Sequence, residues 1–262
     1  MKKILLLLAL FLCINTSWGT VRVDRIYYNL NTEDMTAEVT YGQKHYRGDI
    51  VIPEQVTVDG TVYSVTSLGD FCFNDCISLT SVTIPNSVTS LGESCFYGCS
   101  DLTSITIPNS VTSLGKRCFY NCTSLESVTI SNSVTSLADN IFEKCSSLVS
   151  VTIPNSVTSL GKWCFGSCSS LTSVAIPNSV TYLGQSCFYF CHNLTSVTIP
   201  NSVTGLGDWC FYGCSRLTSI TMLPTTPPTA GSSIFDYTDL NTIYVVNDEA
   251  RALYLRERPW NE

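Results

Sequence analysis

Pairs of cysteines recur at a fixed interval along this chain, and thiols so placed suggest metal binding, disulfide formation or a buried structural role. The chain has 262 residues and 14 cysteines, twelve of which form C-x3-C pairs that follow a 23-residue period. The pairs are Cys72/Cys76, Cys95/Cys99, Cys118/Cys122, Cys164/Cys168, Cys187/Cys191 and Cys210/Cys214. Between the third and fourth pairs the repeat has only Cys145, with Ile141 in the other place. Isoleucine can replace a small buried hydrophobe but neither a metal ligand nor a disulfide partner, so the sequence favours ladders of buried thiols.

Two other interpretations of the cysteines stay open. A disulfide within a pair is disfavoured, because Cβ atoms four residues apart on a helical turn lie about 5–6 Å apart, against roughly 3.5–4.5 Å in a disulfide. Disulfides between neighbouring repeats are easier, and a secretory route would permit them. A structural zinc ion needs four converging ligands, whereas one pair supplies two. Only an accidental zinc site between repeats, with His192 beside Cys191, is conceivable.

The sequence lacks the common motifs of catalytic sites. The chain has no G-x-S-x-G, G-x-x-x-x-G-K-[ST], H-E-x-x-H or G-x-G-x-x-G motif. Its two histidines are His45 and His192, and its recurring serines occupy repeat positions, whereas a catalytic serine would be singular and paired with a histidine. Acids such as Glu93, Asp139 and Asp208 are scattered, as is typical of solvated surface charge. We therefore expect no enzyme, no cofactor and no metal site.

The charge of the chain argues against one class of partner, nucleic acids. The chain carries 14 Lys and Arg against 21 Asp and Glu, a net charge of −7, without a basic cluster. Nucleic-acid binding needs grouped cations to neutralise phosphates, so we expect no nucleic-acid partner. Hydrophobic residues make up 44% of the chain and charged residues 13%, which favours a packed core over disorder.

The cysteines are positioned by copies of one 23-residue unit. Residues 79–216 hold six copies without a gap, a seventh begins at Leu217, and an earlier copy with an insertion begins near Ile50. A period of 20–29 residues with regularly placed leucines is typical of a leucine-rich solenoid. One copy cannot bury its own apolar face, so the copies must stack. We expect about seven coils.

Within a copy, the pattern of apolar residues predicts the local structure. Val82 and Ile84 alternate with polar neighbours, which predicts one short strand per repeat, stacked in parallel along one face. Gly92 is expected to allow a tight bend. Residues 95–99 are then expected to form a short helical turn on the other side, with Phe96 and both cysteines pointing inward.

Six copies of L-[TVE]-S-[VI]-[TA]-I-[PS]-N-S-V-T-x-L-[GA]-x-x-[CI]-F-x-x-C resemble the BspA-like, or Treponema-type, leucine-rich repeat family. The resemblance covers roughly residues 22–256, including cap-like ends. It implies a right-handed leucine-rich-repeat-like solenoid. It also implies a bacterial or protist protein that is secreted or displayed on the cell surface, and that in some members takes part in adhesion to host matrix proteins.

The N-terminus predicts a secretory signal over residues 1–19. Lys2 and Lys3 precede a nine-residue apolar run, and small residues lead to a cleavage site after Gly19. The run is too short to span a membrane, and no later stretch is long and apolar enough. Cys13 offers a lipid anchor as an alternative, although Leu12 stands where a small residue is wanted. The predicted location is extracellular, either secreted or on the cell surface.

The segments outside the repeats predict caps. Residues 20–49 contain two alternating runs, 21–28 and 35–41, and we expect a small antiparallel β cap. The solenoid is expected over residues 50–223. Residues 224–262 form the expected C-terminal cap, with a final strand at 242–246 and a short helix for which Asp248 is the N-cap.

The turn side of the solenoid is one candidate binding surface, because its outward positions differ from copy to copy and include aromatic residues. Such residues are enriched at recognition surfaces. The candidate ligand-binding residues are Tyr97, Tyr120, Trp163, Tyr189, Trp209 and Tyr212. The alternative is that these rings lean on neighbouring coils and seal that side.

The strand face is the other candidate surface, since it presents polar rows that hardly vary. Its residues are Ser104, Thr106, Ser127, Thr129, Ser150, Thr152, Ser173, Ser196 and Thr198. The alternative is that serine and threonine simply suit a solvated parallel sheet. Together, these features predict a secreted or surface-displayed protein-interaction or adhesion module, for which the family resemblance implies host matrix or surface proteins as the partner class. A glycan-binding module, suggested by Trp163, Trp209 and the tyrosines, is the second hypothesis.

Overall fold

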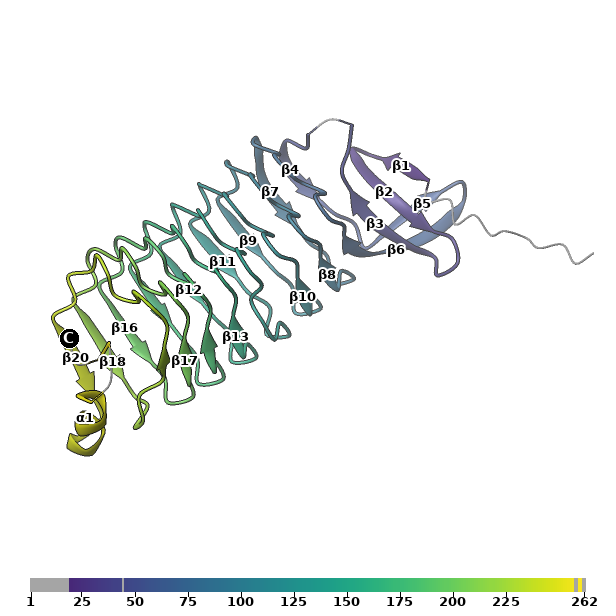
Figure 1. Ribbon diagram of the computed structural model, residues 1–262. Coiled ribbons are helices and arrows are strands. Elements are labelled where there is room, and N and C mark those ends of the chain that lie inside the picture. The colour runs from purple at the N-terminus through teal and green to yellow at the C-terminus, as the bar shows by residue number, and fades with distance from the viewer. Residues whose placement is uncertain (1–18, 44, 257–258, 261–262) are drawn as a thin grey trace, which may run out of the picture.

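A computed structural model describes residues 19–43, 45–256 and 259–260 of the chain. The predicted signal segment, with Cys13, lies outside the described residues apart from Gly19. The chain forms an elongated solenoid with a β cap at its N-terminal end and a helix at its C-terminal end (Figure 1). This architecture confirms the predicted leucine-rich-repeat-like coil with parallel strands about one repeat apart.

Nine short strands line one face of the solenoid, and eight coils connect them. They are β4 (Gly48–Val51), β7 (Leu79–Thr83), β9 (Ser104–Thr106), β11 (Ser127–Thr129), β12 (Ser150–Thr152), β14 (Ser173–Ala175), β16 (Ser196–Ile199), β18 (Ser219–Met222) and β20 (Thr242–Val245). Their parallel ladders join β4 to β7, β9 through β11 and β12 to β14, and β16 through β18 to β20. Because β20 pairs with β18, the stack extends one coil beyond the last recognisable repeat.

A second row of strands lies on another side of all coils but one, where the sequence predicts none. Beyond the longer β6, its members are two residues long. They are β6 (Thr61–Leu68), β8 (Ser90–Leu91), β10 (Ser113–Leu114), β13 (Ser159–Leu160), β15 (Tyr182–Leu183), β17 (Gly205–Leu206) and β19 (Thr229–Ala230). The row divides into the parallel ladders β6–β8–β10 and β13–β15–β17–β19. Two residues are too few for a period-2 pattern to be recognised in sequence.

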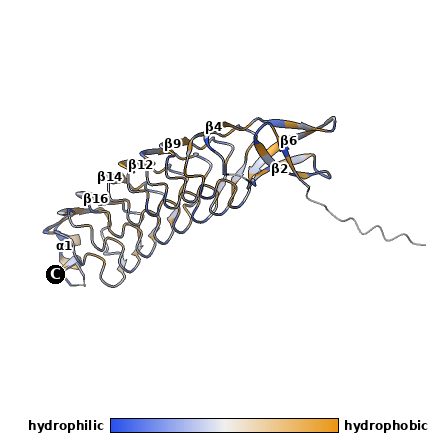
Figure 2. Cartoon of the chain, turned by 90° about the horizontal axis from the view of Figure 1, so that it is seen from above, coloured by the Kyte–Doolittle hydropathy of each residue, from blue (hydrophilic) through white to orange (hydrophobic). Residues whose placement is uncertain are grey.

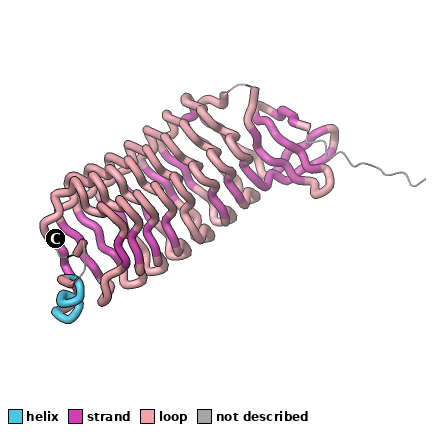
Figure 3. Tube along the Cα trace, in the orientation of Figure 1, coloured by secondary structure: helices cyan, strands magenta, loops and turns pink. Residues whose placement is uncertain are grey.

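The third side of each coil consists of turns, and the expected helical turns are not helices (Figure 3). Local bonds such as Cys76 N–H to the Phe73 carbonyl, 3.1 Å, alternate with bonds to the next coil, such as Phe73 N–H to the Cys95 carbonyl, 2.8 Å. Each turn holds two residues with positive φ, for example Trp163 at 56° and Ser167 at 59°. A right-handed helix needs φ near −63° throughout, so these residues exclude one.

The core is a set of ladders, one rung per coil. Val82 and Ile84 are buried while Thr83 is exposed, as the alternation predicts. The phenylalanine of each turn stacks on its neighbours, with ring centroids 5.0–6.0 Å apart. The stacked rings are Phe73, Phe96, Phe119, Phe142, Phe165, Phe188, Phe211 and Phe235. Figure 2 shows hydrophobic and hydrophilic residues recurring from coil to coil.

The repeated glycine serves close packing rather than the tight bend expected at Gly92. Gly92 has no positive φ, but a Cβ on it would lie 2.5 Å from the backbone nitrogen of Asp70 in the preceding coil. One coil has Ala138 in this place. There the second row of strands is interrupted, since Leu137 bridges only Leu160 of the following coil among the described residues. The larger side chain thus coincides with a break in the ladder.

The N-terminal cap is built from β1 (Thr20–Val23), β2 (Ile26–Asn31) and β3 (Thr36–Thr40), which pair antiparallel. The first predicted run, 21–28, is in fact two strands, because Asp24 and Arg25 turn the chain with φ of 49° and 156°. β3 continues in parallel onto β6, and β5 (Gln55–Val58) pairs antiparallel with β6. Tyr46 packs against Phe73, with ring centroids 4.8 Å apart and planes tilted by 55°, and so covers the first rung of the phenylalanine ladder.

At the other end, β20 is followed by α1 (Asp248–Tyr254). The N-cap is Asn247 rather than the expected Asp248, because the Asn247 side chain accepts a hydrogen bond from Ala250 N–H. Trp260 lies against Phe235 at 5.8 Å and against Tyr254 at 5.5 Å. Within the described part of the chain, no helix is long and apolar enough to cross a membrane.

Candidate functional site

The aromatic residues of the turn side form two groups. In the first, Tyr97 and Tyr120 stack with centroids 4.8 Å apart and planes 10° apart. Lys144 donates a hydrogen bond from Nζ to the Tyr120 hydroxyl at 2.6 Å and lies 5.0 Å from the centre of that ring. This hydrogen bond raises the pKa of Lys144, so its ammonium group stays charged beside the rings.

The second group is an aromatic ridge that crosses four coils, defined here as Trp163, Tyr189, Phe190, Tyr212 and Tyr237. Trp163 lies 4.7 Å from Tyr189, Tyr189 stacks on Tyr212 at 5.1 Å, and Tyr212 lies 5.0 Å from Tyr237. Phe190 contacts both Tyr189, at 4.3 Å, and Tyr212, at 5.8 Å. These contacts join residues 74 positions apart in sequence into one surface.

Of the six predicted residues, the structure places Tyr97 and Tyr120 together in the first group and Trp163, Tyr189 and Tyr212 together in the ridge. Trp209 makes no ring contact within the described residues, and 39% of its surface is exposed. It adjoins the ridge through a backbone hydrogen bond, from Tyr212 N–H to its carbonyl, 3.2 Å.

The repeat pattern does not reveal Tyr237, although 73% of its surface is exposed, which makes it the most accessible residue of the ridge. The recognisable repeats end near residue 222, and the last coil is one residue longer, since Gly231 follows Gly207 by 24 positions. The signal is the segment Ile234-Phe235, which occupies the place of the Cys-Phe of earlier copies.

Several of these aromatic residues sit in an unfavourable backbone conformation. Trp163, Phe190, Trp209 and Tyr237 have φ between 55° and 60°. For bulky side chains this left-handed region is a conformational outlier that costs free energy. The turn itself does not require an aromatic residue, because Ser186 adopts the same conformation one coil from Trp163, with φ of 55°.

The strand face looks different. The Ser and Thr residues predicted to line it are exposed, and they lie in register, for example Ser127 opposite Ser104 and Thr129 opposite Thr106. Near its start, Asp49 accepts hydrogen bonds from the hydroxyls of Ser81, at 2.6 Å, and Thr80, at 2.8 Å, which lower the pKa of its carboxyl. The face is thus a uniform hydroxyl surface.

The cysteines are inward and are free thiols: all thirteen described are buried. The second cysteine of a turn donates its S–H to the carbonyl of the phenylalanine one coil earlier, at 3.1 Å in six coils. Burial raises the pKa of most of these thiols, for example well above its ordinary value at Cys118 and to about 11 at Cys76. Protonated and enclosed, they cannot act as nucleophiles.

No three His, Cys, Asp or Glu side chains in residues 19–43, 45–256 and 259–260 converge to hold an ion. His192, which the sequence placed in a conceivable zinc site beside Cys191, has Ser215 Oγ 3.4 Å from its Nδ1, while Cys191 is a buried free thiol.

Comparison with known proteins assigns the fold to a family. The model of the BspA type leucine rich repeat region matches residues 54–165 and 135–251, which is more than half of the chain. The chain belongs to the BspA-type leucine-rich repeat family. No curated protein matches it.

Among solved structures, this BspA-type chain is similar to a leucine-rich repeat protein from Bacteroides ovatus. The two share 25% identity over 86% of this chain and 76% of that one, with a TM-score of 0.60. It is also similar to the T. pallidum leucine rich repeat protein, with 27% identity over 85% of this chain and 91% of that one and a TM-score of 0.59. Both proteins share the leucine-rich repeat fold with this chain.

Proposed function

We propose that this BspA-type protein is an extracellular interaction module that binds a protein partner through the aromatic ridge together with Trp209. The observation that carries the proposal is the strained placement of large rings on the turn side. Trp163, Trp209, Phe190 and Tyr237 all occupy left-handed turn positions. Serine fills equivalent positions elsewhere, so folding alone does not account for the rings.

The exposure of the rings supports a role in contact. Phe190 and Trp209 expose 36% and 39% of their surfaces, and Tyr237 exposes 73%. Large aromatic side chains that retain exposed area form the energetic centre of many protein interfaces. Ring contacts with Trp163 and Tyr212 hold Tyr189 in place, which reduces the entropy lost on binding.

The shape of the aromatic ridge and the charge beside it favour a protein as the partner. The ridge is a continuous row of rings that contact one another across four coils, which suits a convex or extended protein segment better than a small molecule. Lys144, stacked near Tyr120, adds one cation to the same side of the solenoid. A secreted or surface-displayed location is proposed from the signal-like residues 1–19, and a host matrix or surface protein is the corresponding partner class.

A glycan-binding module is the second candidate, and it rests on Trp209. This ring stacks on no other described aromatic residue, so it is not covered in the way that Tyr189 is. An uncovered indole is suited to stack on a sugar ring. This candidate therefore predicts that Trp209 dominates binding, whereas the protein-binding proposal predicts a contribution from the whole ridge.

The experiment compares two double variants against a panel of matrix proteins and a glycan array. The ridge variant is Trp163→Ser with Trp209→Ser, because Ser186 shows that this turn position accepts serine. The control on the strand face is Thr129→Ala with Thr152→Ala, because Ala175 occupies the next place in that row.

We expect the ridge variant to lose about 30-fold or more in affinity for the bound matrix protein, the effect of removing an interface hot spot of about 2 kcal/mol. The strand-face control should bind as the wild type does. Unchanged binding of the ridge variant together with loss in the control would refute the proposal. Binding only on the glycan array, abolished by Trp209→Ser alone, would favour the second candidate.

A further inference from the structure

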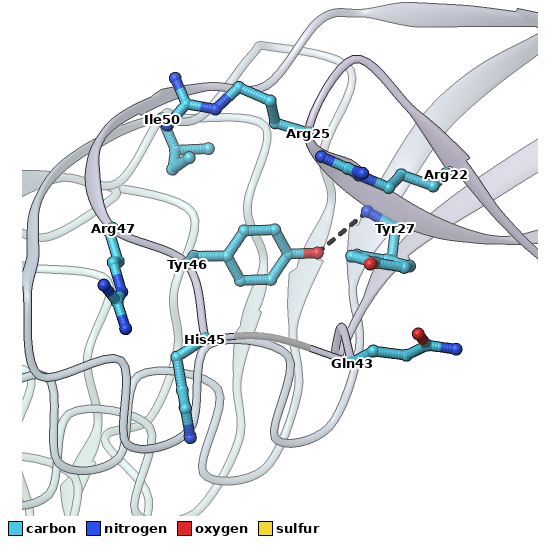
Figure 4. A pocket seen from close by; sticks show the side chains of 8 residues that line it. All are labelled: Arg22, Arg25, Tyr27, Gln43, His45, Tyr46, Arg47 and Ile50. Atoms are coloured by element: carbon cyan, nitrogen blue, oxygen red, sulfur yellow. Dashed lines mark hydrogen bonds between the residues drawn. The ribbon is translucent and has the colours of Figure 1, made fainter.

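A cationic cavity lies at the junction between the N-terminal cap and the first coil, far in sequence from the aromatic ridge. It has a volume of about 810 Å³ and is lined by Arg22, Arg25, Tyr27, Gln43, His45, Tyr46, Arg47 and Ile50. Figure 4 shows the three arginines around the Tyr46 ring, with His45 and Gln43 on the opposite side from Arg22 and Arg25. The residues come from β1, from the turn that follows it, from the start of β2, from the segment that leads to β4 and from β4 itself.

The charge of this cavity contrasts with the rest of the protein. The chain is acidic, with a net charge of −7, and it has no Lys or Arg between Arg47 and Lys116. Three arginines nevertheless gather here. The one ion pair among the described residues joins Lys116 to Asp139, so no carboxylate of the described residues forms an ion pair with these guanidinium groups. Asp24 lines a different hollow, together with Tyr28.

The wall of the cavity is fixed, although its cations are exposed. Tyr46 is buried, donates a hydrogen bond from its hydroxyl to the Thr40 carbonyl at 2.8 Å and accepts one from Tyr27 N–H at 3.0 Å. Arg22 lies over the Tyr27 ring, with 5.8 Å between Cζ and the centroid. His45 lies edge-on to Tyr41 at 5.9 Å. The arginine side chains thus surround a rigid aromatic floor.

The geometry points to a binding site for a short oligosaccharide that carries carboxylate or sulfate groups; this is our further proposal. Guanidinium groups bind such oxyanions in a bidentate manner, which accounts for arginine rather than lysine at three places. Gln43, His45 and Tyr27 add amide and ring groups of the kind that bind sugar hydroxyls and faces.

Three observations favour an anionic sugar over other anions. The volume exceeds that needed by a single inorganic ion and lies in the range of sites for small organic ligands. Ile50 is the one aliphatic side chain in the lining and is only 4% exposed, so the cavity offers no apolar socket for the side chains of a peptide. A long polyanion would be repelled by the acidic solenoid beyond the cavity, which favours a short one.

The test is isothermal titration calorimetry of the full chain with four probes. A heparin-derived tetrasaccharide carries sulfate and carboxylate, tetragalacturonic acid carries carboxylate alone, maltotetraose is neutral, and a tetraglutamate peptide is anionic but not a sugar. The variant is Arg22→Gln, Arg25→Gln and Arg47→Gln. Its matched control, with the same change in net charge, is Lys116→Gln, Lys162→Gln and Arg251→Gln. All six side chains are exposed, so both proteins should fold.

We expect at least one anionic tetrasaccharide to bind, with the arginine variant weaker by at least about 10- to 100-fold, which is the loss expected when a single hydrogen bond to a charged group is removed. The control should change affinity by less than about twofold, apart from screening. Whichever anionic sugar binds identifies sulfate or carboxylate as the recognised group.

Three results would overturn the proposal: no binding of either anionic sugar, equal weakening in both variants, or tetraglutamate binding as tightly as the sugars. The ridge variant Trp163→Ser with Trp209→Ser should bind these sugars as the wild type does. The proposed sugar site and the proposed aromatic ridge can therefore be refuted independently of each other.

Discussion

The variant Gly184→Ala tests whether neighbouring coils approach so closely that no side chain fits between them. A Cβ on Gly184 would lie 2.5 Å from the carbonyl carbon and oxygen of Gly161 and 2.7 Å from the backbone nitrogen of Lys162. All three are backbone atoms, which cannot move aside as a flexible side chain would. Optimal carbon–carbon contact is about 3.5–4.0 Å, so the two coils must separate locally by roughly 1 Å.

The expected cost combines overpacking with lost hydrogen bonds. Overpacking a well-packed site costs about 1–3 kcal/mol. Separation also stretches the 2.9 Å bond from Gly184 N–H to the Leu160 carbonyl and disturbs the pairing of β13 with β15. Each hydrogen bond makes a net contribution of about 0.5–1.5 kcal/mol to stability, which is lost when the bond is broken. Replacing glycine by alanine also restricts the unfolded chain, which stabilises the folded protein by about 0.4–1 kcal/mol and partly offsets the loss. We expect Gly184→Ala to lower the free energy of unfolding by about 2 kcal/mol, within a range of roughly 0.5–4 kcal/mol.

Urea unfolding followed by circular dichroism measures this loss, with Ala138→Gly as the matched control. Ala138 already occupies the equivalent place, and the ladder is open on that side of its coil. Its replacement by glycine should therefore change the free energy of unfolding by less than about 1 kcal/mol. If Gly184→Ala unfolds at the same urea concentration as the wild type, the close approach of the coils is wrong.

Further predictions concern the core and the charges. Phe119→Ala should cost about 3–5 kcal/mol in urea unfolding and Cys118→Ala only about 1 kcal/mol, since they differ in the buried volume removed; equal costs would contradict the ladder packing. The chain from Thr20 should react with a thiol reagent only when unfolded and then show thirteen thiols without reductant, whereas a count near one would mean disulfides. The hydroxyls on Asp49 lower its folded pKa, so their stabilising effect is present above its unfolded pKa and is lost as pH falls through the folded value. The difference in Tm between the wild type and Asp49→Asn should accordingly shrink below about pH 4, and a difference that grows there would contradict this assignment.

The strands and the core could be predicted from sequence because their patterns repeat in every copy. Val82 and Ile84 alternate with polar residues, and Phe96 recurs at a fixed interval, so burial follows from period and position. The exposed hydroxyl rows follow from the same alternation. A repeat amplifies a weak local signal, since each copy is an independent instance of it.

The turns could not be predicted, because hydrogen bonds between coils determine them. The left-handed positions accept Trp163, Ser186 and Arg117 alike, so no residue type marks them. Ring contacts such as Trp163 with Tyr189 depend on how far a side chain leans across to the next coil, which local pattern does not encode. Tyr237 could not be predicted for a different reason: its coil is one residue longer than the repeat, so the repeat pattern does not align with it.

The central claim is that the partner covers the turn side of the solenoid. Hydroxyl-radical footprinting measures this directly, because indole and phenol rings are oxidised in proportion to their exposure. Labelling of Trp209, Phe190 and Tyr237, which are exposed in the free protein, should fall when the bound matrix protein is added. Tyr244, which is also exposed but lies on β20 of the strand face, should be labelled equally in both states. Protection of Tyr244 with unchanged labelling of the three turn-side rings would contradict the account.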